Sequence, residues 1–323
     1  MSITFKMQSS LDLRSPFVVP REISLKQAIL ETLAYSDIFN FPLKVDEIHR
    51  YLPICATIAD VANCLPLLTA DQAAASRGYY FLAGRQHLVG QREERARFSE
   101  VTLRHAVIYG RILAALPFVR MVGITGSLAV LNANEKADLD FMLVAAKGRV
   151  WMARLFALLL GKFTIRFGHV LCPNLILAVH KLEWQKQDLY AARELCQLVP
   201  VAGVDVYMRL RRVNSWTGAF LPNAGDPPPG QFVPAPRRPW LQRLSEWPLN
   251  GALGDRMETW EMRRKIDRFK RQKGFGPETV FSTDICQGNF DHHGWQTRRA
   301  FRERLVLLGL DDGFMDADGS AND

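Results

Sequence analysis

The spacing of apolar residues predicts three helices near the start of the chain, over residues 25–36, 45–51 and 58–68. In the first of these, apolar residues recur three and four positions apart, as they do on one face of a helix. Ser24 and Thr57 stand directly before the first and third helices, where a hydroxyl can accept a hydrogen bond from a free backbone N–H. The aromatic run over 78–82 then predicts a strand, followed by a turn at Gly84.

Apolar strands alternate with helices from residue 86 to residue 214. The pattern predicts strands over 119–124, 137–144 and 170–179. It predicts helices over 86–115, 151–160, 188–199 and 207–214, and a further helix that begins at 127–131. Two more helices are expected over 253–271 and 296–308. Strands that alternate with helices in this way indicate an α/β or α+β core.

A proline-rich stretch separates the last helices from the rest of the chain. Residues 222–239 contain seven prolines and two glycines, a composition that favours extended chain over a packed element. We therefore expect an N-terminal module over 22–90, a core with a helical extension over 91–221, a linker over 222–239 and a C-terminal helical region over 240–310. Residues 1–21 are expected to form a flexible arm, and the acidic residues 311–323 a disordered tail.

The composition is that of an ordinary globular protein, with 48% apolar and 23% charged residues in a length of 323. Disordered, collagen-like and disulfide-scaffold classes are therefore excluded. The chain has no run of about 18 apolar residues, and its first residues lack the apolar stretch of a signal peptide, so no membrane partner is expected. Five scattered cysteines predict reduced thiols in a cytoplasmic protein. The net charge of +8 favours polyanionic partners such as nucleotides or nucleic acid.

The chemically informative stretch begins at Gly126-Ser127 and continues, after ten residues, with Asp138-Leu139-Asp140. Gly126 and Ser127 end a predicted strand and open a predicted helix, where a glycine lets a ligand approach the backbone and free N–H groups favour a phosphate. Asp138 and Asp140 are two positions apart on a predicted strand, so both carboxylates face the same way. Two such carboxylates beside a phosphate site suit Mg²⁺ or Mn²⁺.

This arrangement resembles the nucleotidyltransferases of the DNA polymerase β superfamily. The wider pattern is similar to a group of bacterial proteins that contain such a domain, through Tyr35-Ser-Asp-Ile-Phe, Arg149-Val-Trp, Cys172-Pro-Asn174, Ala192-Arg-Glu194 and Asn214-Ser-Trp216. The resemblance implies that Gly126 and Ser127 hold the triphosphate of an NTP. It also implies that Asp138 and Asp140 bind the metal ion.

The family pattern has a third carboxylate on a following strand, and this chain has no Asp or Glu from residue 141 to residue 182. Asn174 is the residue expected in that position, and its amide cannot act as a base. Three explanations stay open. Glu194 could reach the site from a later helix; a single metal could act with a weak or substrate-derived base; or the domain could bind nucleotide without turnover. A general base is typically worth about 10²–10⁴-fold in rate.

Other segments offer weaker candidates. Arg149 could pair with phosphate, although a surface cation is the alternative. Residues 262–273 hold seven basic residues against one acid and could track tRNA or DNA, although a solvated helix face is the alternative. The first three helices and the aromatic strand resemble a winged helix. The helix over 58–68 has no Lys or Arg, which argues against DNA contact and favours a docking role.

Together these observations predict an α+β protein, with a small mixed-sheet nucleotidyltransferase core between a winged-helix-like module and C-terminal helices. The expected function is a metal-dependent nucleotidyltransferase that moves an NMP from an NTP to an acceptor hydroxyl and releases pyrophosphate. The alternative is a catalytically weak or inactive protein of this fold that acts as a DNA- or protein-binding regulator. The sequence identifies neither the NTP nor the acceptor, which could be a small molecule, a protein or RNA.

Overall fold

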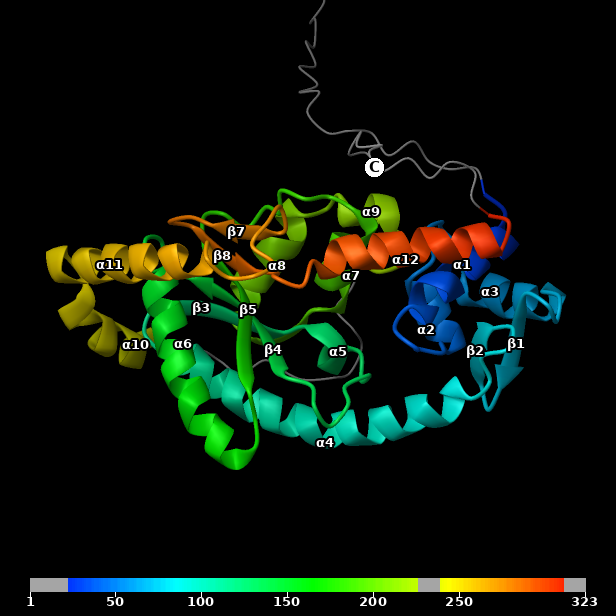
Figure 1. The fold of residues 1–323 in the computed structure, drawn as a ribbon, viewed down its shortest axis with the longest axis horizontal. Helices are drawn as coiled ribbons and strands as arrows, with labels where there is room; N and C mark the ends of the chain where they lie inside the picture. Colours follow the sequence, from blue (N-terminus) through cyan, green and yellow to red (C-terminus); the bar gives the residue numbers. More distant parts are fainter. Residues whose placement is uncertain (1–22, 226–238, 311–323) are drawn as a thin grey trace, which may run out of the picture.

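A six-stranded mixed sheet forms the centre of the protein (Figure 1). The structure, a computed structural model, describes residues 23–225 and 239–310. The sheet consists of β3 (Val119–Ile124), β4 (Leu139–Ala145), β5 (Leu171–Ala178), β6 (Val199–Ala202), β7 (Thr279–Phe281) and β8 (Ile285–Gly288), in the order β6-β3-β4-β5-β8-β7. Strands β4 and β5 are parallel, and every other neighbouring pair is antiparallel. This mixture of helices with a mixed sheet confirms the α+β class.

Before the sheet, the chain forms short helices and a hairpin. These are α1 (Leu25–Asp37), α2 (Val45–Arg50), α3 (Ile58–Cys64), the 3₁₀ turn η1 (Leu65–Leu67), β1 (Ala73–Ser76) and β2 (Tyr79–Leu82). The predicted caps are confirmed, because Ser24 accepts a hydrogen bond from the N–H of Gln27 at 3.2 Å and Thr57 one from that of Asp60 at 3.1 Å. Each cap satisfies an N–H that has no partner inside its helix.

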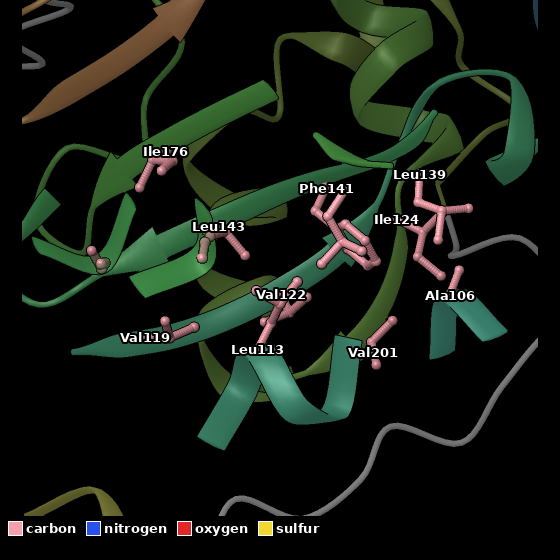
Figure 2. Close-up of a cluster of buried hydrophobic side chains, with 14 of the residues drawn as sticks. Ala106, Leu113, Val119, Val122, Ile124, Leu139, Phe141, Leu143, Ile176 and Val201 are labelled. Carbon is pink, nitrogen blue, oxygen red and sulfur yellow. The ribbon is translucent and has the colours of Figure 1, made fainter. Parts of the chain in front are cut away.

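Helices cover both faces of the sheet. On one face lie α4 (Leu88–Ala115) and α6 (Val150–Thr164), which η2 (Ile165–Phe167) connects to β5. Figure 2 shows the apolar core on this face, which includes Leu139, Phe141 and Leu143 of β4. The opposite face carries α7 (Leu189–Gln197) and α8 (Val204–Val213), which pack on Met142 and Val144 through a second cluster. The single turn α5 (Gly126–Ala129) and α9 (Thr217–Phe220) complete this part.

The last segment adds to the same sheet. It contains α10 (Pro239–Glu246), η3 (Trp247–Leu249), α11 (Ala252–Phe269), the hairpin of β7 and β8, and α12 (His293–Leu307). Helix α11 packs on α6, where Glu258 accepts hydrogen bonds from the backbone N–H groups of Trp151 at 2.9 Å and Met152 at 2.8 Å. Helix α12 lies against both α1 and α7.

Four strands and two helices were not predicted from the sequence: β1, β6, β7, β8, α9 and α10. The four strands are only three or four residues long, too short for an alternating pattern to emerge. The predicted division into domains stays a prediction; the arm over 1–21, the tail over 311–323 and residues 226–238 of the linker lie outside the described residues. In the described ranges, no helix is long and apolar enough to cross a membrane.

Candidate functional site

Gly126 brings the end of β3 into close contact with Asp140 on β4. Its φ of +66° lies in the left-handed region, which side chains rarely adopt. A Cβ added at Gly126 would lie 2.6 Å from Oδ2 of Asp140. The backbone N–H of Thr125 also donates to the carbonyl oxygen of Asp140 at 3.0 Å. The glycine bend and this carboxylate, fourteen residues apart in the predicted motif, therefore form one site.

Asp138 and Asp140 lie together at the start of β4. Leu139 and Phe141 point into the core of Figure 2, so Asp140 shares the opposite face with Met142. Asp138 is exposed and Asp140 is partly buried. Burial raises the pKa of Asp140 to about 6, and the negative charge of Asp138 adds to the rise. A cation near both groups would relieve this repulsion and favour the ionised pair.

Cys172 occupies the place next to Asp140 on the following strand. The two residues are paired in the parallel register of β4 and β5, and the thiol donates a hydrogen bond to the carboxylate. Burial, with the charges of Asp140 and Asp138, raises the pKa of Cys172 to about 12, so the thiol stays protonated at neutral pH. Asn174, expected in this role, is exposed and lies in an irregularity of the register, because Phe141 pairs with Pro173 and the next residue, Met142, pairs with Leu175. Cys172 therefore replaces Asn174 as the neighbour of the two acids.

Glu194 reaches this face of the sheet from α7. Its side chain is partly buried. Burial raises the pKa of Glu194 to about 7, and Asp140 adds to the rise through its charge. Helix α7 is held in place by Asp188, which caps its first turn and forms an ion pair with Arg298 of α12 at 2.8 Å. The structure thus brings Glu194 close enough to Asp140 for the two charges to interact.

Thr125 belongs to this site and was missed in the sequence. Its Oγ1 is buried and has no hydrogen-bond partner among the described residues. A buried hydroxyl without a partner is costly, so a ligand that bonds to it would stabilise the site. Ser127, one residue beyond Gly126, is partly buried in the single turn α5. Thr125 directly precedes Gly126-Ser127 in the sequence, and this position is the signal that could have identified it.

The N-terminal helices approach the same place. Tyr35 of α1 is buried, and the charge of Glu194 adds to the burial that raises its pKa. Tyr190 of α7 has a raised pKa for the same two reasons. Arg193, the neighbour of Glu194, is buried with its guanidinium 4.4 Å from the ring of Tyr35 and 4.3 Å from that of Tyr51. These contacts anchor α7, and with it Glu194, to the N-terminal helices.

Arg149 lies outside this site, which corrects the expectation that it seats phosphate there. It follows the end of β4 opposite to Asp138, on the order of 20 Å away at the rise of a strand. There it forms an ion pair with Asp255 at 2.7 Å and lines a cavity of about 370 Å³ with Arg120 and Lys147. The basic residues over 262–273 are likewise distant, on α11 and just beyond it (Figure 1).

The carboxylate oxygens at the site suit a metal ion that is bound partly by the protein and partly by the phosphate oxygens of a substrate. Among residues 23–225 and 239–310, no group of three or more His, Cys, Asp or Glu side chains has the arrangement of a metal site. Mg²⁺ is usually bound by one or two carboxylates and completed by water and substrate phosphate oxygens. Asp138 and Asp140 can supply those carboxylates, and the absence of a side chain at Gly126 lets the Asp140 carboxylate lie directly against the bend.

Comparisons with known proteins add no identification. No protein-family model, no curated protein and no solved structure matches this chain.

Proposed function

We propose that this protein is a metal-dependent nucleotidyltransferase, which moves an NMP from an NTP to an acceptor hydroxyl and releases pyrophosphate. The observation that carries the proposal is the contact between the glycine bend and the acids. Gly126 leaves no room for a side chain beside Asp140, and Asp138 lies next to it. A triphosphate at the bend would therefore lie against a pair of carboxylates that favour a cation.

The chain's own residues divide the work of this reaction. Backbone N–H groups at Gly126 and Ser127, with the hydroxyl of Thr125, would bind phosphate oxygens. Asp138 and Asp140 would hold Mg²⁺ or Mn²⁺, which when bound neutralises the charge that develops on the phosphates. The acceptor oxygen then forms a bond to the α-phosphorus while the bond to pyrophosphate breaks.

Glu194 would accept the proton that the acceptor hydroxyl loses. Its pKa of about 7 suits a general base at neutral pH, because such a group is partly ionised and can still take a proton. The effect of the Asp140 charge on its pKa supports a position near the proposed metal, where a third carboxylate is needed. Of the three explanations for the missing strand carboxylate, the position of Glu194 favours this one.

We also propose a specific fold for the core and for the N-terminal segment. The order β3, α5, β4, α6, β5 supports a core like that of the DNA polymerase β superfamily. The order α1, α2, α3, β1, β2 supports a winged-helix-like module before it. In this module α3 carries no Lys or Arg, so we assign it a docking role. Tyr35 of α1 and Tyr51, at the end of α2, contact Arg193 of α7, so these helices and not α3 join this segment to α7.

One observation favours the second candidate, a regulator of this fold that binds nucleotide with little or no turnover. Cys172 stands beside Asp140 as a protonated thiol, which is a poor ligand for Mg²⁺. The exposed cations of α11 could then contact nucleic acid.

The first experiment measures NTP binding by calorimetry and pyrophosphate release with Mg²⁺ or Mn²⁺, over a panel of labelled NTPs and acceptors. We expect Asp138→Ala and Asp140→Ala to abolish the metal-dependent part of both. Asp205→Ala, which removes an exposed acid on α8, is the matched control and should behave as the parent protein. Unchanged activity in both site variants would disprove the assignment.

A second set of variants separates the enzyme from the regulator. If Glu194 is the base, Glu194→Gln should keep NTP binding and lower turnover by about 10²–10⁴-fold. If the protein is a regulator, the parent should bind NTP without releasing pyrophosphate. In that case Cys172→Asp, which places a carboxylate beside Asp140, should strengthen metal binding, and Cys172→Ser should not.

A further inference from the structure

Large apolar side chains protrude from the last turns of α6 and from its connection to β5. Five of them, which we call the tip patch, are between 45% and 61% exposed: Leu159, Phe163, Ile165, Phe167 and Val170. The rings of Phe163 and Phe167 contact each other edge to face, with centroids 5.2 Å apart. Figure 1 shows this end of α6 and the start of β5 at the lower edge of the molecule, beyond the sheet. An apolar group of this kind on a surface marks a place of contact.

The tip patch continues onto α4. The ring of His169, in the α6–β5 connection, lies 4.9 Å from that of His105. On the same face of α4 as His105, three further apolar residues are exposed: Val101, Ile108 and Ile112. The exposed apolar surface therefore spans two elements that are far apart in the sequence.

The charged residues of the segment that carries the tip patch are all positive. Lys162 and Arg166 are exposed between its apolar residues, and no Asp or Glu occurs from residue 141 to residue 182. Arg104 and Arg111 are exposed on the adjoining part of α4, where no acid occurs from residue 101 to residue 134. A partner must therefore offer both apolar material and negative charge.

We propose that the tip patch docks on the surface of a lipid bilayer that contains anionic headgroups. Aromatic and aliphatic side chains flanked by Lys and Arg are typical of elements that lie in the bilayer interface. Three of the five apolar residues are aliphatic and give a nucleobase no ring to stack on, which disfavours single-stranded nucleic acid. A symmetric contact with a second copy would place the same cations of both copies face to face.

This contact differs from the sequence-based expectation of no membrane partner, which rested on the lack of a spanning segment. It needs no spanning helix, and it is independent of the proposed nucleotidyl transfer. Docking of the tip patch would, however, determine how the candidate site is oriented relative to the bilayer. The N–H of Leu139, between the two acids, donates to the carbonyl oxygen of Val170 at 2.8 Å. A docked tip would therefore hold the start of β4 close to the lipid surface.

The test is co-sedimentation of the full chain with phosphatidylcholine vesicles, with and without phosphatidylserine. We expect binding to the anionic vesicles that weakens as salt is raised. Phe163→Ser and Phe167→Ser should each reduce vesicle partition by about tenfold, because each removes a ring from the interface. Lys162→Gln with Arg166→Gln should remove the preference for anionic vesicles.

Trp295→Ser is the matched control, because Trp295 is an exposed aromatic residue on α12, away from the tip patch. It should bind vesicles as the parent does, and circular dichroism should show every variant folded. The proposal would be overturned if the parent protein did not bind vesicles, or if the two Phe variants bound them as tightly as the parent does. It would also be overturned if the Phe variants still bound vesicles but lost another interaction of the parent protein, either concentration-dependent self-association or binding of single-stranded RNA.

Discussion

Replacing Gly126 with alanine tests the contact on which the candidate site depends. The left-handed φ of +66° costs an alanine about 1–2 kcal/mol. The new methyl group would also lie 2.6 Å from Oδ2 of Asp140, so the carboxylate must turn away. That rotation breaks its hydrogen bond with the Cys172 thiol, which costs about 1 kcal/mol more. We expect Gly126→Ala to lower the free energy of unfolding by about 2–3 kcal/mol.

Gly84→Ala provides the control for backbone strain. Gly84 has a φ of +77°, and no described heavy atom lies within 4 Å of the position of an added Cβ. Its replacement should therefore cost only the conformational part, about 1–2 kcal/mol. In an Asp140→Ala background the carboxylate is absent, so Gly126→Ala should also fall to this smaller cost.

Urea unfolding of the four variants and the parent protein measures these differences, and calorimetry of NTP binding follows the site itself. Gly126→Ala should weaken NTP binding, whereas Gly84→Ala should leave it unchanged. The contact would be refuted if the two single replacements cost the same, or if the excess at Gly126 survived the loss of the Asp140 carboxylate.

Three further predictions follow from buried groups. The pKa values of Asp140 and Glu194 are raised to about 6 and about 7, so the folded state binds their protons more tightly than the unfolded state does. The free energy of unfolding should therefore fall as the pH rises from about 4 to about 7. Urea unfolding across this range should show the fall in the parent protein and a flatter profile in Asp140→Asn with Glu194→Gln. Arg193→Met should lower stability by about 2–4 kcal/mol, because it removes a buried cation from two aromatic rings, whereas exposed Arg212→Met should change it little in the same assay. Glu258→Ala leaves two buried N–H groups at the start of α6 without their acceptor and should cost about 2–4 kcal/mol in thermal or urea unfolding; Glu258→Gln, which keeps one acceptor oxygen, should cost less.

The elements that carry the candidate site could be predicted from the sequence. The strand expected over 119–124 is β3, and the strand expected over 137–144 is β4 within two residues. Both are apolar runs bounded by polar residues, so the local pattern suffices. The same alternation correctly directs Leu139 and Phe141 into the core.

The neighbours of the acids could not be predicted, because they depend on how strands and helices pair. The register of β4 and β5 pairs Asp140 with Cys172, and an irregularity after Pro173 leaves Asn174 outside the pairing. Glu194 reaches the site only through the packing of α7 on the sheet. Arg149 is close to the motif in sequence, and an intervening strand carries it to the opposite end of the sheet.

The order in which the sheet is completed has a consequence during synthesis on the ribosome. Strand β5 pairs with β8 on the side away from β4, and β8 follows about a hundred residues later, on the order of ten seconds of translation. During that interval β5 presents an open edge to which another strand could add. We therefore expect nascent chains released before residue 285 to aggregate more readily than the finished protein.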